Sequence, residues 1–527
     1  MPRKYRSWLM LFAGLISAPT AFSQTKAPID IGSRIELFID NFLVDRYSGS
    51  AAQKIHHPVP RERVILHDAP WEGSGSGYHS VFKDGNKYRM YYKAWQHAAS
   101  TDTSSSHPLY CAYAESTDGI TWHKPDLGLH AFKGSKKNNI VLISGPELGV
   151  KIDAGHPAVF KDENPAVSPE ERYKAIVTLE NPEYGLVVLK SPDGFKWSLL
   201  GKGVTMRKGH FDSQNLAFWD KELKAYRVYW RQYSKNGTRG IRTATSPDLF
   251  TWSEPQDLVY EDSPEMHLYT NQVKPYHRAP HILIGFPLRY VDRGWSETMR
   301  KLPEPEEREK RAGKTTKGGI ADLTSRYGTV LTESLLMASR DGVHFKRWNE
   351  AFLRPGIERN GSWTYGDNCM AWHVVETGSG LPGAPNELSL YAVENYWKGK
   401  ASALRRYTMR LDGFVSVSAD YKGGEIVTKP LKFAGDQLWL NFSSSAAGGI
   451  ATEIQDENGA PIPGFALIDC EPLFGDSVDK KVLWKKAADL SKLAGKTVRL
   501  RFVLNDADLF ALRFGNTPAP VMTAPTR

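Results

Sequence analysis

The sequence has little cysteine. Its 527 residues include only Cys111, Cys369 and Cys470, which lie far apart and form no Cys-x-x-Cys pair. This spacing excludes a disulfide-rich scaffold and offers no recognisable zinc site. We therefore expect buried thiols, with one disulfide at most, and we predict neither a metal nor a cofactor.

Long apolar runs are also scarce. Residues 8–21 are mostly apolar, follow a basic start and precede a small-residue site, Ala21-Phe22-Ser23. These features are typical of a cleaved signal peptide over residues 1–23, and a membrane anchor is the alternative. No later segment approaches the roughly 20 apolar residues of a membrane-spanning helix. We expect an exported protein, periplasmic or extracellular, without membrane association after cleavage.

The chain has no block rich in Lys and Arg. Its net charge is +9, and three of the positive charges belong to the leader. Nucleic acid is therefore not an expected partner. Aromatic residues, by contrast, are abundant, with 15 Trp, 23 Tyr and 22 Phe, and they suit both strands and sugar-binding clefts. A carbohydrate partner, including an anionic one, fits this composition, and the oligomeric state stays open.

One short pattern recurs four times. Ser-x-Asp, then Gly or Leu, and an aromatic residue three positions later occur at 116–122, 191–197, 246–252 and 339–345. Asp-Gly between β-rich runs is a strong hairpin signal, because Gly tolerates positive φ and the Asp side chain caps the turn. We therefore interpret the four carboxylates as turn formers, remote from chemistry: Asp118, Asp193, Asp248 and Asp341.

A further pair of strand-like runs precedes each of these turns, and helical patterning is confined to a stretch around residues 304–311. Units of four short strands predict an all-β fold, a five-bladed β-propeller over residues 29–420. We expect Ile35–Val44 to close the ring beside the last blade, whose final strands are expected near 404–411 and 414–417. Alternating runs after residue 423 predict a β-sandwich over 423–516, and the Pro- and Thr-rich residues 517–527 predict a disordered tail.

Blade topology predicts where functional side chains gather. The inner strand of a blade begins on the functional face, so candidates lie just before inner strands or just after second strands. Before inner strands lie Asp68, Glu72, Tyr78, His79, Asp153, His156, His210, Asp212, Glu265, His267, Tyr365 and Asp367. After second strands lie Trp95, His97, Glu180, Arg231, Arg289 and Glu394. A single acidic residue at a strand end is ordinarily a turn or cap, but convergence from five blades favours a site.

Such a set suits glycoside hydrolysis. The reaction needs one protonated carboxyl group to assist the leaving oxygen and one ionised carboxylate as base or nucleophile. A third carboxylate can raise the pKa of the acid by like-charge repulsion. Trp and Tyr stack on sugar faces, while Arg and His bind hydroxyl or anionic groups. An axial pocket favours attack at a chain end, hence an exo-acting enzyme.

The layout resembles a known group of enzymes. Tyr-x-Met-Tyr-Tyr at 88–92, the Asp turns and a trailing β-sandwich resemble the five-bladed glycoside hydrolases of families 32, 43, 68 and 117. Residues 33–40 and 67–73 resemble uncharacterised bacterial proteins labelled family 32- or 43-like. By blade position, the resemblance implies Glu72 or Asp68, then Asp153, then Asp212 as catalytic carboxylates. The blade topology, independently of the resemblance, predicts substrate contacts from Trp95, His156, Glu180, Arg231, His267, Arg289, Tyr365, Asp367 and Glu394.

The insertion at Val291–Leu331 adds a hint about the substrate. It is rich in Arg and Lys, contains Trp295, and is expected on the functional face, where it could close over a charged glycan. A solvated mixed-charge loop is the alternative. The alternatives to a glycosidase are a related phosphorylase or anhydrosugar-releasing hydrolase, a glycan-binding propeller without catalysis, and a structural interaction propeller.

Overall fold

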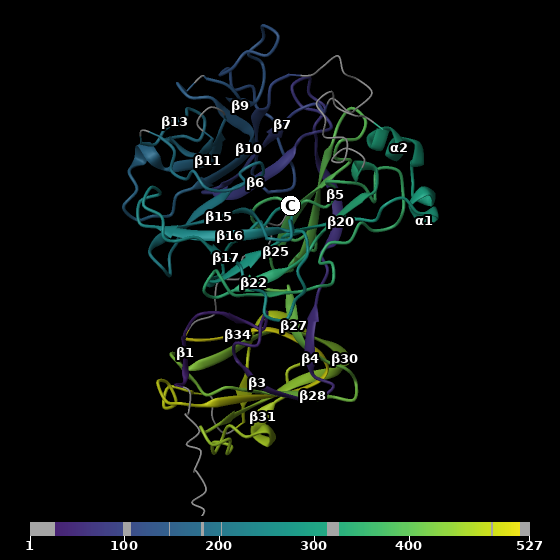
Figure 1. Cartoon of the computed structure of the whole chain (residues 1–527). Helices are drawn as coiled ribbons and strands as arrows, with labels where there is room; N and C mark the ends of the chain where they lie inside the picture. The colour runs from purple at the N-terminus through teal and green to yellow at the C-terminus, as the bar shows by residue number, and fades with distance from the viewer. Residues whose placement is uncertain are drawn as a thin grey trace, which may run out of the picture.

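The computed structural model describes residues 27–97, 107–146, 148–180, 184–201, 203–313, 326–485 and 489–516. Figure 1 shows two parts, a propeller above and a smaller group of strands below, with both ends of the described chain in the lower part. The predicted signal peptide and tail lie outside the described residues.

Three blades follow one another along the chain as four-stranded antiparallel sheets. The first contains β6 (Gly77–Asp84), β7 (Lys87–Ala94), β8 (Tyr110–Ser116) and β9 (Ile140–Ile143). The second contains β10 (Ile152–Lys161), β11 (Tyr173–Leu179), β12 (Gly185–Ser191) and β13 (Ser198–Leu199), with a 3-10 turn, η2 (Pro169–Glu171). The third contains β14 (Leu216–Asp220), β15 (Ala225–Tyr233), β16 (Arg239–Ser246) and β17 (Gln256–Asp257).

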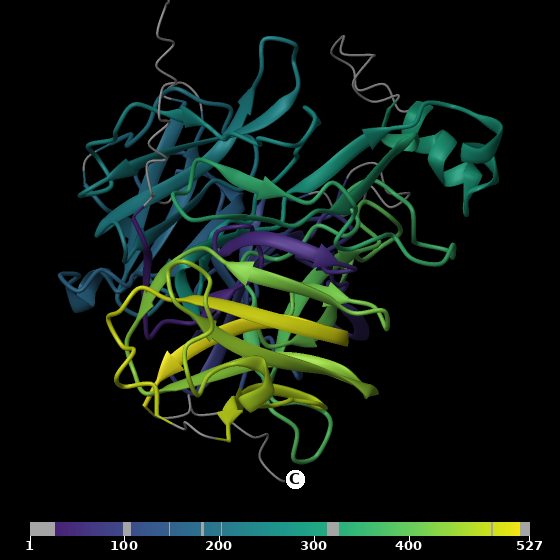
Figure 2. The ribbon, with the colours of Figure 1, turned by 90° about the horizontal axis from the view of Figure 1, so that it is seen from below.

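The fourth blade carries the long insertion. Its sheet contains β18 (Lys274–Tyr276), β19 (Ala279–Gly285), β22 (Met337–Ser339) and β23 (Phe345–Arg347). Between β19 and β22 the chain forms a ribbon of β20 (Leu288–Asp292) and β21 (Val330–Ser334). The ribbon carries α1 (Glu297–Lys301), α2 (Pro305–Gly313) and η3 (Arg326–Gly328), and the helices project from one side of the propeller (Figures 1 and 2). The one predicted helical stretch is confirmed as α2.

The fifth blade closes the ring with a strand from the start of the chain. Its sheet contains β24 (Val375–Thr377), β25 (Glu387–Glu394), β26 (Ala403–Arg410) and β5 (Val59–Leu66), with β5 antiparallel to β26. The prediction that residues 35–44 close the ring is therefore wrong, as is the assignment of 414–417 to this blade. The error arose because β5 is mostly exposed and polar, Val-Pro-Arg-Glu-Arg-Val-Ile-Leu, so its sequence lacks the apolar alternation of a strand.

The lower part is built from both ends of the chain. Its N-terminal strands are β1 (Ile29–Gly32), β2 (Glu36–Leu37), β3 (Val44–Gly49) and β4 (Ala52–Ile55). The C-terminal ones are β27 (Val415–Ala419), β28 (Gly424–Thr428), β29 (Leu431–Phe433), β30 (Gln437–Gln455), β31 (Cys470–Glu471), β32 (Asp476–Lys481), β33 (Leu483–Trp484) and β34 (Arg499–Gly515), with η4 (Leu467–Asp469). β34 pairs with β2, β27, β28 and β30, and the strands enclose one apolar core. Residues 29–55 thus pair with the predicted sandwich strands rather than with the propeller.

The four Asp turns are confirmed as scaffold. In each, the Asp carboxylate accepts hydrogen bonds from the two backbone N–H groups that lie two and three residues later, as Asp118 does from Ile120 and Thr121 at 2.7 Å each. Ser116 pairs with Tyr88, at the end of the blade away from Lys93. We call that end, where inner strands finish, the opposite face, and the end where they begin the site face.

Amide side chains tie the blades together at the axis. The Gln214 side chain donates to the carbonyl oxygens of Tyr78 and Pro157, at 3.1 and 2.7 Å. Gln272 donates to the Gln214 side chain at 2.9 Å and to the Met370 carbonyl oxygen at 3.0 Å. The two glutamines thereby fix the relative positions of all five inner edges, which is a precondition for a rigid axial site.

The three cysteines are buried free thiols, as expected. Within the described ranges, no helix is long and apolar enough to cross a bilayer. In the same ranges, no group of three or more metal-ligating side chains gathers.

Candidate active site

Side chains from all five blades meet at the centre of the site face. The His156 ring lies against the Tyr78 ring, with 4.6 Å between centroids, and the Lys93 ammonium lies 4.8 Å from the same ring. On the far side, the Arg231 guanidinium covers Tyr269 at 4.5 Å. We call the set Tyr78, Lys93, Asp153, His156, Arg231, Tyr269 and Tyr396 the axial group.

Asp153 is the carboxylate of this group. It lies in β10, where the register with β11 shifts between Asp153 and Ala158, an irregularity of the kind that is common next to active sites. One carboxylate oxygen lies 2.6 Å from His156 Nδ1, and the other accepts the Gly155 N–H at 2.6 Å. Burial acts to raise its pKa, but His156, this N–H and the Lys93 charge outweigh burial and lower the pKa. Asp153 is therefore ionised at neutral pH.

Lys93 is a buried amine inside an aromatic cage. Its ammonium donates to the Tyr396 hydroxyl at 2.7 Å and lies 5.1 and 5.5 Å from the rings of Tyr396 and Trp95. Burial lowers its pKa from 10.5 to about 7, although the Asp153 charge opposes the shift. A lysine with such a pKa can gain or lose a proton near neutral pH.

Replacing Lys93 with Met is expected to stabilise the protein. A pKa of about 7 in the folded state, against 10.5 unfolded, means that the unfolded state binds more protons between these values, so stability rises with pH there. Met removes the buried charge and fills the same space. We expect a gain of about 1–4 kcal/mol in unfolding free energy at pH 6, which shrinks toward pH 10.

Urea unfolding at both pH values measures this gain. The matched control is Lys87→Met, on the same strand but with a half-exposed side chain paired to Glu115. A Lys93→Met variant that is less stable than the wild type at pH 6 would contradict the interpretation.

Arg231 and Asp212 form the third-blade part of the site. Arg231 is buried at the end of β15, and its guanidinium donates to the Asp212 carboxylate at 2.9 Å and to the Tyr269 carbonyl oxygen at 2.9 Å. The Asp212 side chain is 66% exposed, so it is the accessible carboxylate of this face. Arg231 fixes one side of it and leaves the rest open to a ligand.

A tyrosine wall continues the site toward the fifth blade. The Tyr365 hydroxyl donates to the Tyr269 hydroxyl at 2.9 Å, and the rings of Tyr327 and Trp397 lie 4.9 and 4.8 Å from Tyr365. Behind this wall, Asp367 accepts the Tyr396 N–H at 2.9 Å. Burial raises the pKa of Asp367 well above its usual range, although the Tyr396 N–H acts to lower it.

The insertion of the fourth blade contacts this wall. Arg311 of α2 donates to the carbonyl oxygens of Tyr396 and Trp397, at 3.2 and 2.8 Å, and to the Thr364 hydroxyl at 2.5 Å. The predicted place of the insertion, on the site face, is therefore confirmed. Trp295 is 37% exposed and stacks on Arg300 instead of the wall.

Backbone strain marks the same face. Tyr78 has φ of 52°, and Asn395 and Trp397 have φ of 59° and 58°, a region that favours glycine. Such conformations persist only where surrounding contacts enforce them, and they gather at binding and catalytic sites. Here the contacts made by Lys93, His156 and Arg311 hold the backbone in these conformations.

Glu72, predicted as a catalytic carboxylate, lies in a separate buried network. It accepts hydrogen bonds from the Tyr92 hydroxyl and the Lys124 ammonium at 2.6 Å each, and from the Ala69 N–H at 3.1 Å. Burial raises its pKa although Lys124 acts to lower it. None of these partners belongs to the axial group, and the side chain has no exposure. Asp68, the alternative, is 64% exposed beside Lys124.

Several predicted substrate contacts are engaged elsewhere. Glu180 pairs with Lys151 at 2.9 Å, and Arg289 pairs with Glu333 within the β20–β21 ribbon. Glu394 binds Arg63, Arg359 and Arg405, and so ties the closing strand to the fifth blade. His267 accepts the Arg239 N–H at 3.1 Å. Trp95, His156, Arg231 and Tyr365 are the predicted contacts that the fold brings to the axial group.

Comparisons with known proteins give fold neighbours but no sequence relatives. No family model matches the chain, and no curated protein matches it. A thermostable family-43 glycoside hydrolase is similar, with a TM-score of 0.40 and 11% identity over 65% of this chain and 92% of that one. The family-32 β-fructofuranosidase BmSUC1 of Bombyx mori gives 0.37 and 10%, over 88% and 95%. An N-acetylgalactosamine deacetylase from F. plautii gives 0.40 and 11%, over 69% and 97%.

Sequence reasoning missed three members of the axial group: Lys93, Tyr269 and Tyr396. Each lies within two residues of a position that was named, namely Trp95, His267 and Glu394. Lys93 carried a signal of its own, since it is the one charged residue in the run Met90–Ala94 of a second strand. A charge in such a run implies a buried, partnered group at a functional edge.

Proposed function

We propose that this protein is a glycoside hydrolase whose substrate binds at the axial group. The observation that carries the proposal is Asp153, an ionised carboxylate held by His156 at the centre of a face lined with tyrosines. Glycosidases need such a carboxylate as base or nucleophile beside the sugar. Tyrosine and tryptophan rings supply flat apolar surfaces for sugar rings.

Asp212 is the second carboxyl group of the proposed reaction. It is accessible, is oriented by Arg231, and lies on the same face as Asp153. In this scheme Asp153 acts as base or nucleophile, and Asp212 protonates the leaving oxygen. The separation of the two carboxyl groups around a bound sugar decides whether the configuration is inverted or retained, and NMR of the released anomer reads that outcome.

The charges of the site favour an acidic sugar. Lys93 and Arg231 place two cations beside one face of the axial group, and the insertion adds Arg311 behind the tyrosine wall. We propose that the site takes a uronic or sulfated residue at the end of a chain, as an exo-acting enzyme would. Export by the predicted signal peptide would bring the protein to such polysaccharides outside the cytoplasm.

Reducing-sugar release from neutral and acidic polysaccharides tests the proposal. Wild type should release sugar from at least one substrate, and Asp212→Asn should lower kcat about 100-fold or more, the lower range for losing a general acid. The matched control is Asp257→Asn, because Asp257 is 63% exposed and also paired with an arginine, Arg242, but lies on an outer strand. Binding without release across the panel would instead support a glycan-binding propeller.

A further inference from the structure

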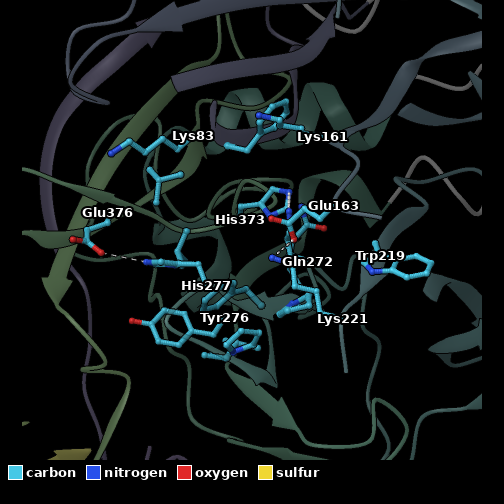
Figure 3. A pocket seen from close by; sticks show the side chains of 18 residues that line it. Lys83, Lys161, Glu163, Trp219, Lys221, Gln272, Tyr276, His277, His373 and Glu376 are labelled. Carbon is cyan, nitrogen blue, oxygen red and sulfur yellow. Dashed lines mark hydrogen bonds and ion pairs between the residues drawn. The ribbon is translucent and has the colours of Figure 1, made fainter. Parts of the chain in front are cut away.

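A second pocket lies at the opposite end of the propeller axis. It has a volume of about 330 Å³, and all five blades contribute to its lining (Figure 3). Lys83 and Lys161 lie at the ends of strands β6 and β10. Tyr78 and Asp153, which belong to the axial group, lie at the starts of the same two strands. The pocket is therefore separated from the proposed active site by the length of the inner strands.

Cations dominate this pocket. Each of the first four blades contributes one lysine, in the order Lys83, Lys161, Lys221 and Lys274. The carboxylates in the lining are Glu163 and Glu376. Glu163 is half-exposed and lies 3.4 Å from Lys221, and Glu376 is already bound by Asn386 at 2.9 Å. The lining therefore carries more positive than negative charge.

Among the described residues, no carboxylate forms an ion pair with Lys274, although the nearby charge of Glu163 acts to raise its pKa. The Lys274 ammonium donates a hydrogen bond to His373 Nε2 at 3.1 Å and lies 5.5 Å from the Trp372 ring, so its polar partner is an imidazole rather than a carboxylate. Burial lowers the pKa of Lys274 to about 8 and that of His373 well below its usual range. An uncompensated cation in such a place is costly, and a bound anion would remove the cost.

The backbone strain at His373 and the shape of the pocket both point to the surroundings of Lys274. His373 has φ of 87°, a strained conformation that holds its ring beside Lys274. Trp219 and Tyr276 also line the pocket (Figure 3), and the partly exposed Trp219 offers flat apolar surface. A volume of about 330 Å³ suits a small molecule of monosaccharide size.

We infer that this pocket is a second ligand site, which binds a small molecule through a carboxylate, sulfate or phosphate group placed between Lys274 and Lys161. Lys274 is the buried anchor. Lys161 reaches the pocket from a half-exposed position, although it also pairs with Asp84 at 2.7 Å. The oxyanion has two sources, a free inorganic ion or the acid group of a sugar, and the apolar surface of Trp219 favours the sugar.

Isothermal titration of the full chain tests the site, with sodium sulfate, sodium phosphate, glucuronate and glucose as probes at constant ionic strength. We expect glucuronate to bind more tightly than the inorganic ions, and glucose to show no binding here. Lys274→Met and Lys161→Gln should each weaken glucuronate at least tenfold. Lys87→Gln is the matched control, since Lys87 is about as exposed as Lys161 and paired with Glu115, but is absent from the lining.

Each possible result either supports or overturns the proposed ligand site. Tighter binding of sulfate or phosphate than of glucuronate would keep the anion site but assign it to a free ion. No binding of any anion, equal binding of glucose, or an equal loss in Lys87→Gln would overturn it. Lys161→Gln leaves the buried anchor in place and covers the case in which Lys274→Met fails to fold. Because Lys274→Met and Lys161→Gln alter only the opposite face, sugar release by these variants should match the wild type, which separates this inference from the proposed hydrolase.

Discussion

Asp153→Asn is expected to lower kcat by about 10³-fold or more on any polysaccharide that the wild type cleaves. The amide cannot act as base or nucleophile, and its neutral side chain loses the charge that His156 and the Gly155 N–H stabilise. General acid–base groups contribute about 10²–10⁴-fold, and losing a nucleophile has at least that effect. Substrate affinity should change little, because the tyrosine wall and Arg231 remain.

The matched control for this variant is Asp341→Asn. Asp341 also lies 2.7 Å from the Nδ1 of a histidine three residues later, His344, and also accepts nearby backbone N–H groups, but it occupies an Asp turn on the opposite face. The Asp341→Asn variant should retain full activity and lose a small part of its folding stability. An unchanged kcat in Asp153→Asn, with the fold intact by circular dichroism, would reject Asp153 as the catalytic carboxylate. Asp212 would then be the remaining candidate.

Glu36→Gln is expected to destabilise the protein by about 3–5 kcal/mol, since it removes the buried carboxylate at the centre of an ionic cluster. Glu36 in β2 receives Arg34 at 2.6 Å and Arg340 of the fourth blade at 2.9 Å. His281, also of the fourth blade, lies 3.2 Å away. The cluster therefore joins the lower part to the propeller, and the variant takes one counterion from Arg340, which keeps Asp40 at 2.8 Å, and from His281.

The pKa of Glu36 also predicts how the folding stability falls at acidic pH. Burial acts to raise the pKa of Glu36, but His281 and the two arginines lower it from 4.5 to about 2. Because the folded value lies below the unfolded one, the stabilisation is complete above about pH 4.5 and is lost as the pH falls toward 2. This shift corresponds to roughly 3 kcal/mol.

Urea unfolding between pH 3 and 7 measures both effects. Wild type should lose stability over this range more steeply than Glu36→Gln, whose amide does not titrate. The control is Asp45→Asn, which removes an exposed partner of Arg499 and should change stability by about 1 kcal/mol or less. Parallel pH profiles for wild type and Glu36→Gln would show that the cluster does not hold the two parts together.

The blades could be predicted because their signals are local. An Asp turn is closed by contacts within three residues, as at Asp118, so its sequence alone specifies it. Strand pairs beside such turns follow from apolar alternation. The inner strands all begin at the site face. The order of strands and turns along the sequence therefore also predicted the edge where Asp153, His156 and Arg231 lie. The spacing of the three cysteines predicted buried thiols with one disulfide at most, and the structure leaves all three free.

Ring closure could not be predicted, because it depends on a contact between distant parts of the chain. Leu66 pairs with Ala403, and the polar strand that makes this pairing has no pattern of its own. Residues 29–55 join the lower sheet for the same reason, since β3 pairs with β28 across the whole propeller sequence. Long-range pairing is set by shape and burial, which a sequence reports only indirectly.

The sequence by itself determined that this protein is a five-bladed propeller followed by further strands, and which face carries its carboxylates. The tertiary structure decided which carboxylates meet. It placed Glu72 in a closed network with Tyr92 and Lys124, and left Asp153 and Asp212 on the site face with Lys93 and Arg231. The physical reason is that burial and partners, not position along a strand, fix whether an acidic side chain is a structural contact or a reactive group.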